Sequence, residues 1–144
     1  MSSRSRLEAV RDSFIAEAVS APRLFSDLAQ MEQYIAESYK SRSFIELIQN
    51  ADDAHATRFG IHQLGPDILV GNNGHPFTPE DVEALCRSGS SHKVRGQNTI
   101  GYRGIGFKSV VNISRRITVL SGEYGFCFDR AETKRLLPTL RRCQ

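Results

Sequence analysis

Residues 46–54, "ELIQNADDA", follow the apolar pair Phe44-Ile45 and decide how the rest of the chain is interpreted. The stretch favours a helix, and at about 100° per residue its side chains divide into two faces. One face is an apolar stripe that can enter a core, formed by Phe44, Leu47, Ile48 and Ala51. The opposite face carries Glu46, Asn50 and Asp53 and can line a cavity. A solvated helix face is the alternative interpretation of the same residues.

Two side chains of the polar face have ligand chemistry of their own. Glu46 could act as a general base. Asn50 offers a neutral amide oxygen of the kind that a magnesium ion accepts alongside phosphate oxygens.

Composition predicts one globular domain. The chain has 144 residues, 40% hydrophobic and 24% charged, which is ordinary for a globular protein with a single core. No apolar run approaches the roughly 20 residues of a membrane span, and the first residues contain no signal-peptide core, so we expect a cytoplasmic protein. The three cysteines match no zinc spacing or disulfide framework. A net charge of +3 permits an anionic ligand without requiring nucleic acid.

The hydrophobic pattern predicts helices, then a hairpin, a short helix and a second hairpin. Leu7, Val10, Phe14 and Ala18 recur at helical spacing up to a break at "SAPRL", and a second helical set then continues towards Phe44. The segments "TRFGIHQL" and "DILVGN" favour a hairpin, as do "RRITVLSG" and "EYGFCFDR". Between the hairpins, "TPED" favours a helix start with Thr78 as the cap. A last short helix is expected over "AETKRLLPTL".

Two further segments have the composition of ligand-binding turns. In "ILVGNNGHPFTPED" a strand ends in Asn-Asn-Gly, where an Asn side chain can both accept from and donate to the edge of a base. In "GYRGIGFKS" the glycines let the backbone approach a ligand at the start of a helix, which is an anion site by geometry. Taken separately, each segment is also compatible with an ordinary turn.

The three segments, in this order, resemble those of the Bergerat-fold (GHKL) ATPases, which include heat-shock chaperones, type II topoisomerases, sensor histidine kinases and MutL. They are most similar to the sacsin-type ATP-binding domains, judged from "ELIQNADDA", "NNGHPFTPED" and "GYRGIGFKSV" followed by "SGEYGFCFDR". The resemblance covers residues 44–130. It implies a binding site for ATP and Mg²⁺.

The resemblance assigns roles to residues of the first two segments. It implies that Glu46 is the general base that activates water, that Asn50 binds magnesium, and that Asp53 lies near the nucleotide. It places Asn72 where most relatives keep an Asp that accepts a hydrogen bond from the adenine amino group. Gly74 matches the glycine that follows, and Phe77 stands where an apolar side chain packs near the base.

The resemblance also assigns the lid and the phosphate loop. Residues 88–99 correspond to a lid over the phosphates, where Lys93 and Arg95, with Arg87 beside them, could neutralise charge or simply be solvated. The second glycine segment corresponds to the phosphate-binding loop, formed by Gly101, Tyr102, Arg103, Gly104, Ile105, Gly106, Phe107 and Lys108.

Two positions depart from the family pattern. Asn72 replaces the expected Asp, and Pro76 replaces the expected second glycine. An Asn oxygen can still accept from an adenine amine, but a charged acceptor makes a hydrogen bond about twice as strong. Adenine affinity is therefore expected to be weaker, or selectivity looser.

These observations predict an α/β fold: a two-layer sandwich in which a mixed, mostly antiparallel sheet carries helices on one face. We expect a helical segment over residues 1–43, an ATP-binding core over 44–130 and a tail over 131–144 cut from a larger protein. The expected function is ATP binding with slow magnesium-dependent hydrolysis, as the switch of a larger chaperone-like or defence-type protein.

Other functions and partners follow from the same residues. A nucleotide-binding module without turnover is the alternative. A sensor-kinase domain is disfavoured because no dimerisation helix with an acceptor His is present. A nucleic-acid module is disfavoured because the basic residues are dispersed. The expected partners are ATP or ADP and further domains or client proteins. No membrane partner is expected, and homodimer formation is left as an open alternative.

Overall fold

The computed structural model describes residues 2–38, 42–86, 110 and 113–137. Within them lie five helices and four strands. In chain order these are α1 (Ser3–Ser20), α2 (Pro22–Ser38), α3 (Ser43–Asp53), β1 (Phe59–Leu64), β2 (Asp67–Asn72), α4 (Pro79–Cys86), β3 (Arg116–Ser121), β4 (Tyr124–Asp129) and α6 (Arg130–Leu136).

The two N-terminal helices form as their periodicity predicts. Ser2 caps α1, because its hydroxyl oxygen accepts a hydrogen bond from the Ser5 backbone N–H at 3.2 Å. The chain leaves helical geometry at Ala21 (φ −137°), and Pro22 then occupies the first position of α2, where a missing N–H costs no hydrogen bond. The break predicted at "SAPRL" is therefore confirmed.

Both predicted hairpins are present as antiparallel pairs. β1 pairs with β2 from Phe59 opposite Asn72 to Leu64 opposite Asp67, and β3 pairs with β4 from Arg116 opposite Asp129 to Ser121 opposite Tyr124. Each two-residue connection begins with a glycine at positive φ, Gly65 at 61° in the first and Gly122 at 57° in the second. A left-handed conformation of this kind favours glycine.

The predicted helix starts use reciprocal side-chain caps. At the start of α4 the Thr78 hydroxyl oxygen accepts a hydrogen bond from the Asp81 backbone N–H at 3.2 Å. In return, the Asp81 carboxylate accepts one from the Thr78 backbone N–H at 2.8 Å. Each side chain thus gives a hydrogen-bond acceptor to the backbone N–H of the other residue. At α6 the Asp129 carboxylate accepts from the N–H groups of Ala131 and Glu132. The last helix therefore begins at Arg130, one residue before the predicted start.

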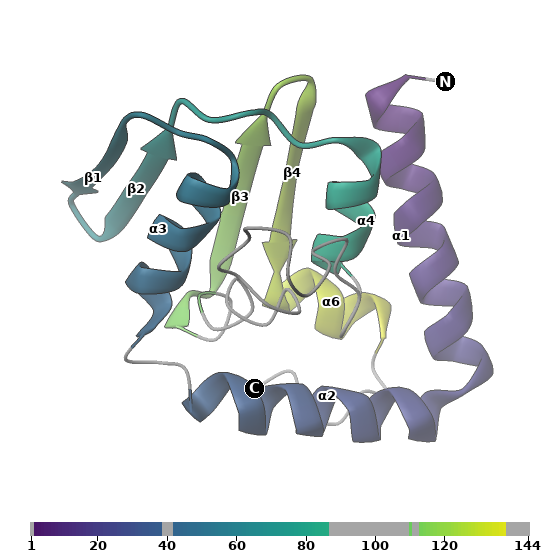
Figure 1. Ribbon diagram of the computed structural model, residues 1–144. Coiled ribbons are helices and arrows are strands. Elements are labelled where there is room, and N and C mark those ends of the chain that lie inside the picture. Colours follow the sequence, from purple (N-terminus) through teal and green to yellow (C-terminus); the bar gives the residue numbers. More distant parts are fainter. Residues whose placement is uncertain (1, 39–41, 87–109, 111–112, 138–144) are drawn as a thin grey trace.

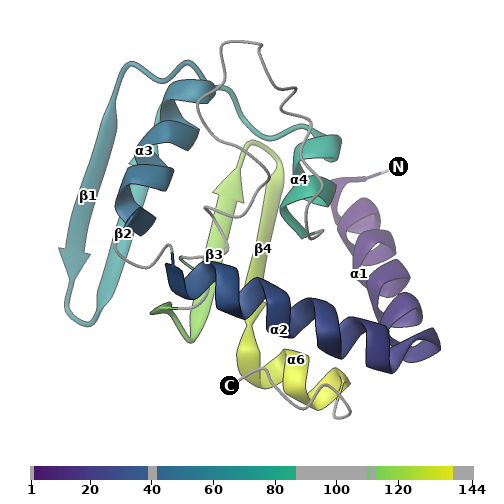
Figure 2. The same cartoon turned by 60° about the horizontal axis from the view of Figure 1, so that its bottom comes forward.

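Helices α1 and α4 and strand β4 contribute three of the four buried apolar residues in the described part of the chain. Ala18 of α1, Val82 of α4 and Tyr124 of β4 are 3%, 2% and 5% exposed. In Figures 1 and 2, α1 lies beside α4, and α2 crosses the end of the molecule where α6 lies. The segment before residue 43 thus belongs to the packed domain, since it contributes Ala18 to this core.

The hairpins do not join into one sheet among the described residues. They form two separate two-stranded antiparallel sheets, which stand next to each other, with α3 in front of the β1–β2 hairpin (Figure 2). The mixed α/β class is confirmed, whereas the single sheet of a two-layer Bergerat sandwich is not. No helix in the described part of the chain is long and apolar enough to cross a membrane.

Candidate functional site

Helix α3 carries the three polar residues predicted to face a ligand. Glu46, Asn50 and Asp53 lie at i, i+4 and i+7 of this 11-residue helix and so share one face. The helix ends at Ala54, whose N–H donates to the Asn50 carbonyl oxygen at 3.1 Å. His55 then adopts a left-handed φ of 57°, which turns the chain away from the helix axis.

Glu46 is buried, which is unusual for a carboxylate. The residue is only 7% exposed. A guanidinium nitrogen of Arg42, one turn earlier, lies 4.0 Å from a carboxylate oxygen of Glu46, and the Arg42 side chain is itself 53% exposed. A buried charge of this kind requires a partner, so the sequence around α3 supplies a cation beside the candidate base.

The apolar stripe predicted on α3 packs only in part. Phe44 is 43% exposed and Ile48 is 49% exposed, whereas Ala51 of the same stripe is buried at 3%. Asn50 and Asp53 are half-buried. The expectation that the apolar stripe enters the core is therefore met at Ala51 but not at Phe44 or Ile48, and Glu46 of the polar face is buried.

The turn after β2 is held to the segment before β1 by the side chain of Asn73. Its Oδ1 accepts from the backbone N–H groups of Thr57 at 3.0 Å and Arg58 at 2.8 Å, and its Nδ2 donates to the Thr57 hydroxyl oxygen at 2.9 Å. Sequence reasoning treated this residue as part of an ordinary Asn-Gly turn. Its only sequence signal is the second Asn of "NNG".

Gly74 brings the same turn against the end of α3. A Cβ added at Gly74 would stand 2.7 Å from the Ala54 Cβ, 2.7 Å from the Ala54 carbonyl oxygen and 2.9 Å from the Asn72 Oδ1. The next residue continues the contact, because the His75 N–H donates to the Ala54 carbonyl oxygen at 2.8 Å. Asp53, the last residue of α3, is therefore adjacent to a junction that admits only a glycine at position 74.

The side chain of Asn72 folds back into this turn. Its Oδ1 accepts from the Gly74 N–H at 2.9 Å, which is the hydrogen bond of an Asx turn. The residue itself is exposed. The structure thus brings together Asn72, Gly74 and the C-terminal end of α3.

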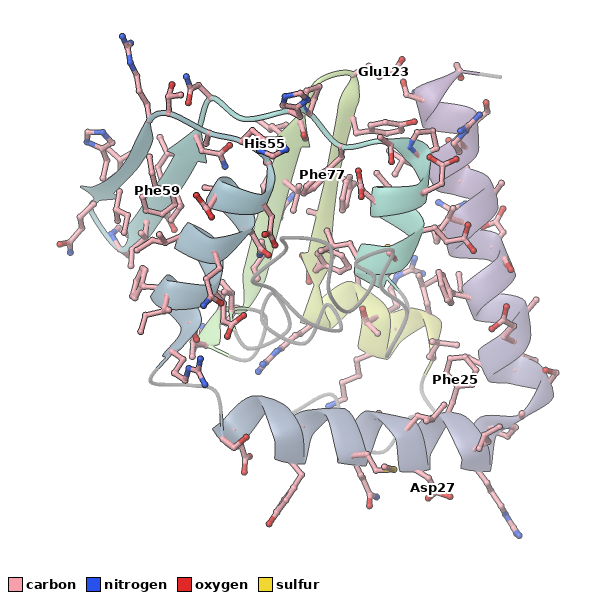
Figure 3. All side chains as sticks on the ribbon, viewed as in Figure 1. Phe25, Asp27, His55, Phe59, Phe77 and Glu123 are labelled. Carbon is pink, nitrogen blue, oxygen red and sulfur yellow. The ribbon has the colours of Figure 1, made fainter. Side chains whose placement is uncertain are left out.

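Phe77 and Pro76 connect this turn to the second hairpin. The Phe77 N–H donates to the Ser121 hydroxyl oxygen at 2.8 Å, and Phe77 is half-buried in the segment leading to α4 (Figure 3). Pro76, the departure from the family glycine, occupies space beside Gly122, where an added Cβ would stand 3.1 Å from the proline Cβ. The proline therefore contributes to packing between the first hairpin and the β3–β4 turn.

The three histidines in the described part of the chain lie at the surface. His55, His62 and His75 are all exposed. The rings of His55 and His75 meet edge to face with centroids 5.5 Å apart, across the junction of α3 with the turn after β2. Within the described residues no group of three or more His, Cys, Asp or Glu side chains could hold a metal ion.

The predicted lid and phosphate loop lie outside the described residues. These are residues 88–99 with Arg87, and the loop residues Gly101, Tyr102, Arg103, Gly104, Ile105, Gly106, Phe107 and Lys108.

The chain is similar to known proteins. The model of the sacsin domain family matches residues 60–136, more than half of the chain. The chain is 38% identical over 112 residues to the protein NO VEIN of Arabidopsis thaliana, covering 72% of this chain and 4% of that protein. It is 34% identical over 100 residues to human sacsin, covering 57% of this chain and 2% of sacsin.

A bacterial repair protein is also related. The chain is 32% identical over 79 residues to the DNA mismatch repair protein MutL of Exiguobacterium sibiricum, covering 49% of this chain and 13% of MutL. The chain thus spans a small fraction of each of these relatives, and no solved structure matches it significantly. Because the family model covers more than half of its residues, the chain belongs to the sacsin domain family.

Proposed function

We propose that this domain binds ATP with Mg²⁺ and hydrolyses it slowly, as the nucleotide switch of a larger chaperone-like or defence-type protein. Membership of the sacsin domain family and the similarity to MutL support a GHKL-like nucleotide-binding module. The observation that carries the proposal is the junction at Gly74, which holds the turn containing Asn72 against the C-terminal end of α3.

The spacing along α3 suits an extended ligand. Asp53 and Glu46 are seven residues apart, which is about 10 Å along a helix axis. A nucleoside triphosphate whose base lies at Asn72, with Phe77 near the base, can therefore extend along this face towards Glu46. The loop 101–108 would hold the phosphates through its backbone N–H groups.

Magnesium would be held from the same helix face. Asn50 supplies a half-buried amide oxygen, and oxygen ligands of this type fit a magnesium ion that also binds phosphate oxygens. The ion would neutralise phosphate charge when bound. Glu46, one turn away, would take the proton from the attacking water.

A binding module without turnover is the second candidate, and one contact favours it. The Arg42 guanidinium lies 4.0 Å from a carboxylate oxygen of Glu46, so Glu46 has an ion-pair partner within its own helix that gives it a structural role without catalysis. The two candidates share the nucleotide site and differ only in hydrolysis.

Calorimetric titration with ATP, ADP and GTP, each with and without Mg²⁺, tests the proposed function. We expect saturable binding of ATP that tightens with magnesium. Phosphate release under single-turnover conditions, with protein in excess, then separates the ATPase from the binding module. Absence of binding for every nucleotide contradicts both candidates.

Asn50→Ala tests the magnesium role. We expect it to weaken ATP binding about tenfold or more with magnesium present and to change it little in EDTA, because the substitution removes a metal ligand. Asn50→Asp, which keeps an oxygen at that place, is the matched control and should retain the magnesium dependence. An equal loss in both conditions would show instead that Asn50 acts in packing.

A further inference from the structure

The orientation of the Asn72 amide is fixed by its own turn. A backbone N–H can only donate, so the group that faces the Gly74 N–H at 2.9 Å must be the oxygen Oδ1. The amide nitrogen Nδ2, with its two donor hydrogens, therefore points the other way. Rotating the amide would place donor against donor and leave the Gly74 N–H without its acceptor.

The oxygen is confined to the inside of the turn, whereas the nitrogen is not. A Cβ at Gly74 would stand 2.9 Å from Oδ1, so this oxygen lies against the turn backbone. Nδ2 has no hydrogen-bond partner in the described part of the chain, and Asn72 is exposed. Oδ1 already accepts one hydrogen bond inside the turn, so the group of Asn72 whose hydrogen-bonding capacity is wholly unused among the described residues is the donor Nδ2.

An aromatic residue lies beside this donor. The β1–β2 register places Phe59 directly opposite Asn72, so the two side chains leave the hairpin on the same face. Phe59 is half-buried and is labelled on the first hairpin in Figure 3. An aromatic ring beside a hydrogen-bonding amide is a combination that suits a planar base, which stacks on one group and pairs with the other.

We propose that the nucleotide site prefers purines that carry a carbonyl oxygen at the ring position where adenine carries its amino group, as guanine and hypoxanthine do. The proposal rests on the proposed function, because it concerns the base in that same site. The Asn72 Nδ2 donates to such an oxygen, whereas it opposes the amino group of adenine, which is also a donor. The adenine nucleotide then binds more weakly.

Competition binding with ATP, GTP and ITP measures this preference. ITP isolates the effect of the carbonyl, because hypoxanthine has the carbonyl of guanine but lacks its amino group. We expect GTP and ITP to bind about tenfold or more tightly than ATP, the usual scale for leaving a buried donor unpaired. Tighter binding of ATP than of both other nucleotides would overturn this inference while leaving the proposed function in place. Absence of binding for all three would overturn both.

Asn72→Asp gives the decisive comparison, since an aspartate keeps one oxygen on the Gly74 N–H and replaces the donor by an acceptor of the same shape. We expect it to reverse the order, so that ATP binds about tenfold or more tightly than ITP. Asn73→Asp is the control, because it adds the same charge one residue away and retains the oxygen that accepts from Thr57 and Arg58. It should shift all three nucleotides together. An unchanged ATP-to-ITP ratio in a folded Asn72→Asp variant would show that Asn72 does not contact the base.

Discussion

Glu46→Gln is expected to remove ATP hydrolysis while leaving ATP affinity close to that of the parent chain. One positioned general base contributes about 10²–10⁴-fold to a rate, and the amide of Gln cannot accept the proton. The substitution keeps the size of a side chain that is only 7% exposed, so it leaves no cavity. The measurement is phosphate release in single turnover, paired with a calorimetric titration of ATP.

The control for Glu46→Gln is the same change at Glu37, an exposed residue of α2. Glu37→Gln should alter neither binding nor turnover. Hydrolysis by Glu46→Gln at the parental rate would contradict the general-base role. A parent chain that binds ATP without any turnover would favour the binding module, with the Glu46–Arg42 ion pair as a structural contact.

Local signals were sufficient to predict most of the helices and strands. Both hairpins follow from short runs of β-forming residues separated by a glycine-containing pair, and the observed strands lie within the predicted segments. The start of α4 follows from Thr78 and Pro79, because capping depends on side chains within one turn of the helix end. Turns and helix caps depend on residues that are close together in the sequence, so the sequence alone can predict them.

The direction in which α3 faces was not predictable in the same way. Periodicity states which residues share a face, but it does not state which neighbour covers that face. Phe44 and Ile48 look like core residues by composition, yet they are about half exposed, and Glu46 is buried beside Arg42. Whether separate hairpins join into a sheet also depends on segments far apart in the sequence, so the single predicted sheet had no local signal.

In the candidate site, too, some features could be predicted from the sequence and others could not. The structure brings Asn72, Gly74 and the end of α3 together, whereas the roles that the resemblance implies for them stay predictions. The bridge from Asn73 to Thr57 and Arg58 was missed, because it spans 15 and 16 residues and the dipeptide Asn-Gly is common in ordinary turns. The roles of Glu46, Asn50 and the loop residues 101–108 stay predictions.

Gly74→Ala is expected to disrupt both folding and nucleotide binding through one added methyl group. The new Cβ would stand 2.7 Å from the Ala54 carbonyl oxygen, and because that atom is backbone, the turn must move away from α3. The movement weakens the hydrogen bond from the His75 N–H to the same oxygen and separates Asn72 from Asp53. We expect a loss of about 1–3 kcal/mol in the free energy of unfolding, the usual range for overpacking.

In Gly74→Ala the loss of nucleotide affinity should be larger than the loss of folding stability alone would cause. The proposed base site at Asn72 and the polar face of α3 lie on opposite sides of the junction at Gly74, so a shift of the turn separates them. We expect about tenfold weaker ATP binding at temperatures where Gly74→Ala is fully folded, since a displacement that misplaces one hydrogen-bonding group costs on that scale. Chemical denaturation gives the stability, and calorimetric titration below the unfolding transition gives the affinity.

Gly71→Ala is the matched control for Gly74→Ala, because it makes the same change three residues earlier, where an added Cβ meets no atom within 4 Å. It should be neutral for both folding and binding. The double variant Ala54→Gly/Gly74→Ala should recover part of the lost stability, since it removes the methyl contact and leaves the contact with the carbonyl oxygen. Parental stability and parental ATP affinity in Gly74→Ala would show that the turn and α3 can separate without consequence, and the junction would then have no role in holding the site together.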